Sequence, residues 1–242
     1  MTESTVRIAS IYPTLLGTYG DGGNVLALTH RARLRGLTTD VVDVSPGQTL
    51  PRDADLYVLG GGEDTAQVAA AEALRTDGGL SQAIDRGAAL LAICAGYQLI
   101  GHEFPDATGA ASPGVGIIDI RTDRLPTRAV GELLAKPDLQ APAGITDLLT
   151  GYENHAGATH LGPDARPLAQ VEVGVGNGDG SEGAVSGRVI GTYLHGPCLA
   201  RNPQIADVLL GWVVGRDFEP IVEREVEELR AERLAYVRRS GR

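Results

Sequence analysis

A cysteine and a histidine each stand at the end of an apolar run, where open α/β folds bind their ligands. Cys94 ends the run Ala88–Ile93 and is followed by the small residues Ala95 and Gly96. This pattern is typical of a sharp strand-to-helix turn that projects a nucleophile, and a helix that begins there favours the thiolate. A cysteine at a strand end is more often a small buried apolar residue, but the turn favours the nucleophile.

His195 offers the base that such a thiol needs. It follows the β-like run Val189–Leu194 and precedes Gly196 and Pro197. An imidazole with a pKa of about 6.5 accepts a thiol proton and returns it to a leaving group near neutral pH. The other histidines lie in an expected helix or in loops, where a surface or capping role is the simpler interpretation; they are His30, His102, His155 and His160. We therefore predict nucleophilic catalysis by Cys94 and His195.

Three glycines that follow the apolar strand Leu56–Leu59 are the candidate oxyanion hole. Backbone without Cβ atoms approaches a substrate closely, so N–H groups of Gly60, Gly61 and Gly62, with that of Ala95, can hold a tetrahedral oxyanion. The alternative is an ordinary glycine-rich turn. The glycine loop directly follows a strand, and the next strand along the chain leads to Cys94. This position favours the role as an oxyanion hole.

Two other glycine clusters are not predicted to carry the chemistry. GTYGDGGN at 17–24 precedes an expected helix and can hold an anion there, but it lacks the GxGxxG spacing of a dinucleotide site. GVGNGDGSEG at 174–183 is interpreted as a flexible hairpin between two strands.

The elements that must position these residues alternate between strands and helices in the first half of the chain. Strands are expected at VRIASIY, TDVVDV, Leu56–Leu59 and Ala88–Ile93. One helix is expected from about Asn24 to Arg35, and a helical segment is expected between the third and fourth strands, running through Ala83. This order predicts an α/β fold with a doubly wound, mostly parallel sheet flanked by helices. The last two strands are apolar on both faces, as strands covered on both sides should be.

The second half predicts antiparallel additions to this sheet. GVGIIDIRTD, PLAQVEVGVG and GRVIGTYLHG read as strands separated by glycine and aspartate turns. A C-terminal helix is expected at about 220–239, packed on the domain through a narrow apolar stripe of Val222, Val226 and Leu229. With 43% apolar residues, the 242 residues are expected to form a single domain, 1–242.

Composition excludes several classes of function. A net charge of -10 disfavours nucleic acid as a partner, and no apolar run is long enough for a membrane span. The two cysteines lie outside any CxxC motif, which disfavours a structural metal site or a disulfide framework. Because the N-terminus also lacks the pattern of a signal peptide, we expect the protein to be located in the cytoplasm. The single lysine, Lys136, leaves no nucleotide-binding GxxxxGK[ST] loop, so an ATP-driven step needs another subunit.

Taken together, the CAGYQ turn, the GGG loop and the YLHGP histidine resemble class I glutamine amidotransferase domains, which share a flavodoxin-like architecture. YGDGGN, LGGGEDTAQ, GYENHAG at 151–157 and GTYLHGP narrow the resemblance to the GatD-type glutaminase subunits of lipid II isoglutaminyl synthase. These matches run from about Tyr19 to Pro197.

This resemblance implies L-glutamine as the substrate, with Cys94 as nucleophile and His195 as base. It also implies that Arg128 binds the α-carboxylate of glutamine through its planar guanidinium, and we include Gln98 in the substrate site. In the family, ammonia passes to MurT, a Mur ligase-like subunit of a heterodimer that binds ATP and amidates the D-glutamate of lipid II to D-isoglutamine. No cofactor is expected in this subunit, and ATP and Mg²⁺ are expected on the partner.

One departure concerns the carboxylate that should orient His195. Many class I domains carry His-x-Glu, whereas here Gly196 and Pro197 follow the histidine. The orienting group must therefore come from elsewhere. We expect the partner to fix the imidazole, so that the complete site forms only in a heterodimer. If the group comes from this chain instead, Glu153 is the first residue to test. Two other interpretations stay open: a glutaminase for another acceptor, of the cobyric acid type, and a non-catalytic binding module of the same fold.

Overall fold

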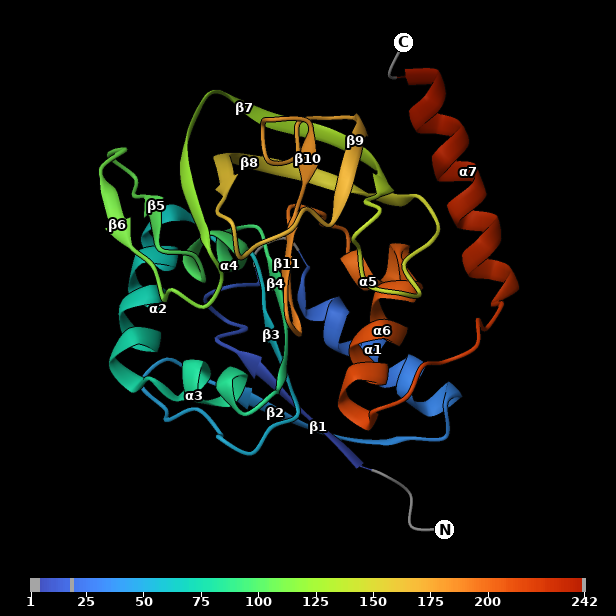
Figure 1. Ribbon diagram of the computed structural model, residues 1–242, viewed down its shortest axis with the longest axis horizontal. Coiled ribbons are helices and arrows are strands. Elements are labelled where there is room, and N and C mark those ends of the chain that lie inside the picture. Colours follow the sequence, from blue (N-terminus) through green and yellow to red (C-terminus); the bar gives the residue numbers. More distant parts are fainter. Residues whose placement is uncertain (1–4, 18–19, 241–242) are drawn as a thin grey trace.

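A parallel sheet forms the centre of the computed structural model, which describes residues 5–17 and 20–240 (Figure 1). Its six strands run in the order β11-β12-β4-β3-β1-β2, and β11 is antiparallel to its neighbour β12. The strands are β1 Thr5–Ile11, β2 Thr38–Val44, β3 Leu56–Leu59, β4 Ala89–Ile93, β11 Ala184–Ser186 and β12 Val189–Thr192. All residues of β3 and β4 are buried, as their apolar sequences predict.

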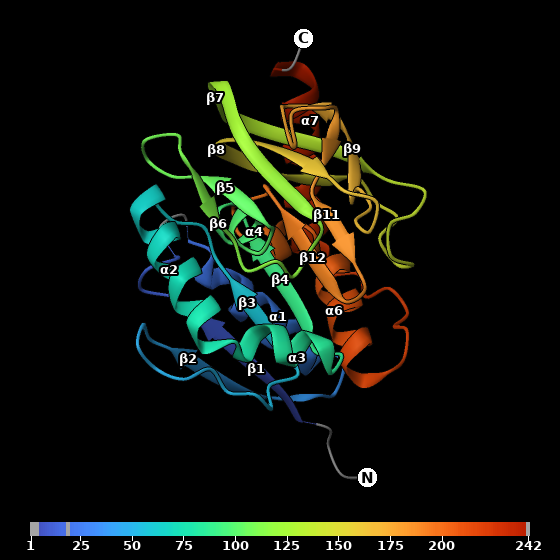
Figure 2. The ribbon, with the colours of Figure 1, turned by 60° about the vertical axis from the view of Figure 1, so that its left-hand side comes forward.

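Helices cover both faces of this sheet. On one face lie α2 (Asp64–Asp77) and α3 (Gly79–Asp85), and on the other lie α1 (Gly22–Leu34) and α6 (Pro203–Val214) (Figure 2). The predicted doubly wound α/β fold is therefore confirmed. The single helical segment expected to run through Ala83 is two helices, because Gly78 between them adopts a left-handed φ of +64°.

A second sheet holds most of the antiparallel strands. They are β5 Glu103–Pro105, β6 Ala111–Pro113, β7 Ile120–Pro137, β8 Leu149–Leu161, β9 Ala169–Val173 and β10 Ser181–Glu182. The strand predicted at GRVIGTYLHG joins the parallel sheet as β12, but it runs parallel to β4, and β11 is the antiparallel addition to that sheet. The strands predicted at GVGIIDIRTD and PLAQVEVGVG lie in the second sheet instead. The strands of the second sheet pair among themselves, mainly around the long β7–β8 hairpin.

Backbone hydrogen bonds between Tyr152 and His195 join the second sheet to the first. The His195 N–H donates to the Tyr152 carbonyl at 2.9 Å, and the Tyr152 N–H donates to the His195 carbonyl at 3.1 Å. Figure 2 shows the second sheet lying over the end of the parallel strands where β4 leads into α4 (Ala95–Leu99). The candidate residues therefore lie between the two sheets.

The C-terminal helix α7 spans Arg224–Ser240, close to the expected bounds, but its apolar stripe faces outward. Val222 is 79% exposed and Leu229 is 68% exposed, and Val226 is only partly buried. Arg230 and Val237 are the buried residues of the helix. The prediction that the stripe packs on the domain was therefore wrong. Among the described residues, the helices are too short or too polar to cross a membrane.

Candidate active site

Cys94 occupies the sharp turn between β4 and α4. It adopts φ +52° and ψ -105°, a conformation that costs a non-glycine residue about 1–3 kcal/mol. Small neighbours make the turn possible, because a Cβ atom at Gly96 would lie 2.8 Å from the Gly60 carbonyl oxygen. The strained backbone aims the thiol into the space between the two sheets, where Cys94 is 5% exposed.

His195 lies against this thiol and is held from two sides. Its backbone pairs with Tyr152, and its Nδ1 lies 3.2 Å from Asp21 Oδ1. Burial alone would lower the pKa of His195, but hydrogen bonds to Asp21 and Cys94 and their negative charges raise it to about 10. The imidazole therefore holds a proton at neutral pH, and Nε2 is the nitrogen left for the thiol.

Asp21 supplies the carboxylate that the sequence left unassigned. It is 1% exposed, and its two oxygens divide their roles: Oδ1 faces His195, and Oδ2 accepts the Gly61 N–H at 2.7 Å. The chain thus supplies an orienting carboxylate for His195 itself, in a Cys94–His195–Asp21 arrangement, whereas the expectation that the complete site forms only in a heterodimer stays a prediction. Asp21 belongs to the GTYGDGGN segment, of which residues 18 and 19 lie outside the described residues.

The first two residues of the glycine loop contact the groups of the triad and its turn. The Gly61 N–H is already bound to Asp21, which contradicts its predicted role as an oxyanion donor. A Cβ atom at Gly61 would lie 2.7 Å from His195 Cε1, so only glycine fits there. The Gly60 carbonyl accepts the Gly96 N–H at 3.2 Å and so fixes the turn of Cys94. The N–H groups of Gly62 and Ala95, which line the cavity, remain candidates.

A small cavity of about 50 Å³ opens beside the thiol and is lined by both Cys94 and Arg128. Arg128 lies where the β7–β8 register shifts between Arg124 and Ala129. Its Nε donates to Asn154 Oδ1 at 2.7 Å and its terminal nitrogen donates to the Asn154 carbonyl at 3.1 Å. The structure therefore places Arg128 in the cavity that Cys94 also lines, with its guanidinium held by Asn154, and its role as a carboxylate ligand stays a prediction.

The charges around this cavity suit a free amino acid. Arg124 and Arg128 line it together with Asp64 and Asp106, so both a carboxylate and an ammonium group find opposite charges there. Gln98 also lines the cavity, but its amide donates to the Tyr193 hydroxyl at 3.2 Å and accepts from Gln67 at 2.9 Å. These contacts give Gln98 a positioning role in this structure.

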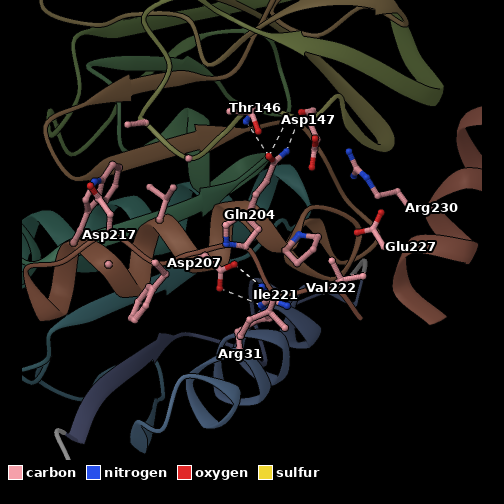
Figure 3. A pocket seen from close by; sticks show the side chains of 18 residues that line it. Arg31, Thr146, Asp147, Gln204, Asp207, Asp217, Ile221, Val222, Glu227 and Arg230 are labelled. Carbon is pink, nitrogen blue, oxygen red and sulfur yellow. Dashed lines mark hydrogen bonds and ion pairs between the residues drawn. The ribbon is translucent and has the colours of Figure 1, made fainter. Parts of the chain in front are cut away.

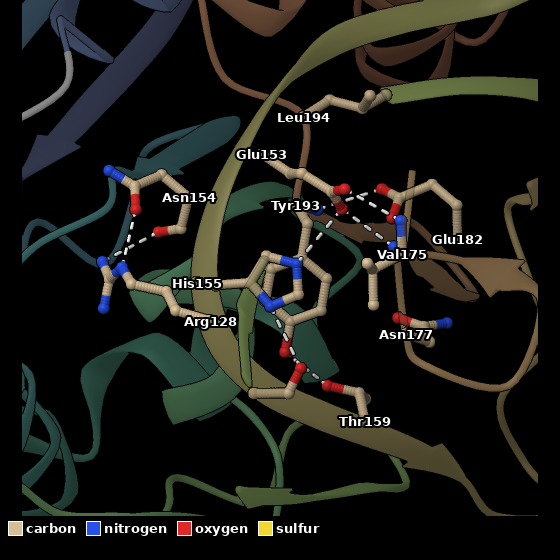
Figure 4. A network of polar contacts seen from close by, with 12 residues as sticks. Arg128, Glu153, Asn154, His155, Thr159, Val175, Asn177, Glu182, Tyr193 and Leu194 are labelled. Carbon is tan, nitrogen blue, oxygen red and sulfur yellow. Dashed lines mark hydrogen bonds and ion pairs between the residues drawn. The ribbon is translucent and has the colours of Figure 1, made fainter. Parts of the chain in front are cut away.

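Behind the cavity lies a buried polar network that starts from the GYENHAG segment (Figure 4). Glu153 does not reach His195, because its carboxylate accepts the N–H groups of Val175 and Gly176 at 2.8 and 2.9 Å. The His155 ring lies 3.4 Å from Glu153 Oε2 and stacks on Tyr193 with 3.6 Å between ring centroids. This segment therefore supports the strand that carries His195, but it does not orient the imidazole.

Glu182 holds the same strand from the other side. Its Oε1 accepts hydrogen bonds from the Thr192 hydroxyl and, at 2.9 Å, from the Tyr193 N–H. Burial raises the pKa of Glu182 to about 7, and the charge of Glu153 adds to this effect. Around neutral pH a substantial fraction of this carboxyl group is therefore uncharged. Within the described residues, no group of three or more histidine, cysteine or acidic side chains could hold a metal ion.

The chain is similar to known proteins in both sequence and structure. A model of the CobB/CobQ-like glutamine amidotransferase domain matches residues 7–203. Subunit GatD of the glutamine-hydrolysing lipid II isoglutaminyl synthase of Staphylococcus aureus is 33% identical, over 88% of this chain and 86% of that protein. The same subunit of Streptococcus pneumoniae is 32% identical, over 92% and 89%. Cobyric acid synthase of Brucella canis is 40% identical, over 65% of this chain and 32% of that protein.

Solved structures agree on the fold. A glutamine amidotransferase of Thermotoga maritima superposes with a TM-score of 0.55 at 18% identity, over 81% of this chain and 78% of that one. The glutaminase domain of Trypanosoma brucei CTPS with bound acivicin gives a TM-score of 0.53 at 12% identity, over 88% and 96%. At these identities the comparison shows the fold alone.

Replacing Asp21 with asparagine tests the triad. We expect glutamine turnover to fall at least about 100-fold, because an imidazole without its carboxylate shifts from the productive geometry and loses its raised pKa. Steady-state release of glutamate measures the effect, with Asp43→Asn on the exposed part of β2 as the matched control. Turnover by Asp21→Asn at the rate of the control would contradict the role of Asp21.

Replacing Glu182 with glutamine tests the buried carboxyl group through stability. Its pKa is raised from 4.5 to about 7 on folding, so the stability that the neutral carboxyl contributes is present below pH 4.5 and is lost as the pH rises to 7. A glutamine does not titrate. The variant should therefore gain stability relative to the wild type between pH 4.5 and 7, on the order of 3 kcal/mol.

Urea unfolding of both proteins at pH 4.5 and pH 8 measures this gain, and any constant effect of the amide cancels between the two values. A difference in unfolding free energy that does not change with pH would show that folding does not raise the pKa of Glu182.

Proposed function

The chain belongs to the family of CobB/CobQ-like glutamine amidotransferase domains, and on that premise we propose that it hydrolyses L-glutamine through a thioester on Cys94. The observation that carries the proposal is the buried contact of His195 with both Cys94 and Asp21. A thiol, a protonated imidazole and an orienting carboxylate are the groups that an acyl-transfer reaction on an amide requires.

The proposed reaction begins when the Cys94 thiolate attacks the side-chain carbonyl carbon of glutamine. The N–H groups of Gly62 and Ala95 stabilise the oxyanion, and Arg128 binds the α-carboxylate. His195 then donates its proton to the nitrogen as the C–N bond breaks and ammonia leaves. The same imidazole takes a proton from water, which attacks the thioester, so that the C–S bond breaks, glutamate departs and the thiolate beside a protonated imidazole is restored.

For the acceptor, we propose the D-glutamate of lipid II, amidated to D-isoglutamine by a Mur ligase-like partner of the MurT type. Support comes from the two GatD relatives, which this chain matches over 86% and 89% of their length. The cobyric acid synthases match over 32–40% of theirs, although Brucella canis reaches a higher identity, so an acceptor of the cobyric acid type is the second candidate. The assembled triad counts against a non-catalytic binding module.

The proposed partner also carries the ATP and Mg²⁺ of the amidation step, and this subunit carries no cofactor. A chain with one lysine has no GxxxxGK[ST] loop to hold a nucleotide, which supports this division. The proposed compartment is the cytoplasm. Both cysteines, Cys94 and Cys198, are free thiols, and a reducing compartment suits a thiol nucleophile.

Replacing Cys94 with serine tests the nucleophile. Glutamate release should fall by at least about 1,000-fold, because a serine hydroxyl is far less ionised than a thiol at neutral pH. Cys198→Ser is the matched control, since this second buried cysteine lies outside the cavity and its replacement should leave turnover unchanged. Equal rates in Cys94→Ser and Cys198→Ser would rule out the thioester mechanism.

Addition of the cognate Mur ligase-like subunit, ATP and lipid II tests the acceptor. Glutamine should support amidation of lipid II by the wild-type complex but not by the Cys94→Ser complex, whereas an ammonium salt should support both. Glutamate release without amidation of lipid II, under conditions where the ammonium salt does support it, would leave the glutaminase in place and exclude this acceptor.

A further inference from the structure

Helix α7 lies beyond the part of the chain that the family model matches. That match ends at residue 203, whereas α7 spans Arg224–Ser240 and stands at the edge of the molecule beside the second sheet (Figure 1). Because the shared amidotransferase domain does not include this helix, its role should concern something other than the common glutaminase chemistry.

The outer side of α7 and the segment just before it carry an apolar seam, formed by the exposed residues Val222, Leu229 and Tyr236 and the half-buried Val226. These residues and Arg233 are spaced by four, three, four and three residues, the spacing with which one helix packs against another. Val222 is 79% exposed, Leu229 68% and Tyr236 49%. Arg233 extends the seam, since its guanidinium lies 5.7 Å from the centre of the Tyr236 ring.

The seam continues into a groove at the base of the helix (Figure 3). This groove of about 450 Å³ has apolar walls that include Trp212, Phe218 and Ile221, and Val222 belongs to both the groove and the seam. Seam and groove thus form one apolar surface. A contiguous exposed apolar surface of this kind marks a site of protein association.

Acidic side chains border this surface. Glu225, Glu228 and Glu232 lie along one flank of α7, and of these Glu228 pairs with Arg224. At the groove, Asp147 and Asp217 are among the lining residues. The net charge of -10 opposes self-association and favours a partner surface with lysine or arginine beside its apolar residues.

Several arginines near this surface are already bound within the chain, among them Arg224 with Glu228 and Arg233 with Glu132. Arg31 pairs with Asp207 and, at 2.6 Å, with Glu223. Arg230 donates to the backbone carbonyls of Leu148 and Arg201, the latter at 2.7 Å. These contacts offset the charge of the bound arginines, and the carboxylates of Glu225, Glu232 and Asp217 add negative charge at the rim.

The inner side of α7 connects this surface to the candidate active site. Arg201 belongs to α5 (Cys198–Arg201), which begins three residues after His195, and Arg230 binds its last carbonyl. Arg233, which borders the seam, reaches Glu132 of β7 at 3.1 Å, and Arg201 binds the same carboxylate at 2.9 Å. A protein bound to α7 would therefore lie next to the segment that carries the catalytic histidine.

We infer that the apolar seam of α7 and the groove at its base are the docking surface for the ligase partner. The partner would contribute an apolar strip, most simply a helix, bordered by basic residues that meet Glu225, Glu232 and Asp217. This inference rests on the proposed function, and it assigns the partner to a surface that the amidotransferase domain itself does not require.

Leu229→Glu tests the docking surface, with Val41→Glu on the distant edge strand β2 as the control for an added exposed charge. Titration calorimetry with the purified cognate ligase subunit should show at least tenfold weaker binding for Leu229→Glu and no change for Val41→Glu. Glutamate release by the isolated chain should be the same in all three proteins. Glu232→Lys should also weaken binding, and this effect should shrink at high salt.

Three outcomes would overturn the inference. Equal affinity of Leu229→Glu and wild type would place the interface elsewhere and leave the proposed function intact. A wild-type dimer in light scattering that Leu229→Glu converts to monomer would make a second copy of the chain the occupant. If the wild-type chain does not bind the ligase subunit at all, the inference and the proposed acceptor both fail, whereas the Cys94→Ser result still decides the glutaminase chemistry.

Discussion

The hydrogen bond between Asp21 and His195 is the contact on which the rest of the candidate site depends. One carboxylate joins three segments, because Oδ1 faces the imidazole and Oδ2 accepts the Gly61 N–H. The Gly60 carbonyl then binds the Gly96 N–H and fixes the turn at Cys94. Both oxygens of this buried carboxylate are thus bound to groups of the site.

The second sheet makes that contact possible by covering it. Through the Tyr152–His195 backbone pair, β8 holds the histidine in place, and alternate residues of β8 point into the buried network. Glu153 accepts the N–H of Val175 and so holds the loop after β9, and Glu182 accepts the N–H of Tyr193 and so holds the end of β12. The antiparallel strands thus cover the site against water and hold the histidine in place. The parallel sheet alone, without the second sheet over its end, would do neither.

The sequence allowed the parallel sheet and two members of the triad to be predicted, because each signal is local. Buried strands read as apolar runs, and Cys94 stands in a turn whose small neighbours are visible in the sequence. Asp21 could not be found this way: it lies 174 residues before His195 and within a glycine cluster that resembles an anion site. A search for a carboxylate beside a glycine-rich helix start would have been the available signal. The apolar stripe of α7 was wrongly predicted to pack on the domain, because the spacing of apolar residues does not show whether they face the domain or the solvent.

The backbone of Asp21 adds a different consequence, which concerns how the protein can change. Asp21 occupies the N-cap position of α1, and aspartate is among the best capping residues, yet its side chain makes no capping hydrogen bond because it is turned toward His195 and Gly61. The helix therefore forgoes about 1 kcal/mol that a cap contributes. At residue 21 the requirements of folding stability and of catalytic activity therefore oppose each other. Variants selected only for heat resistance should accumulate changes that let the Asp21 carboxylate cap α1 instead of binding His195.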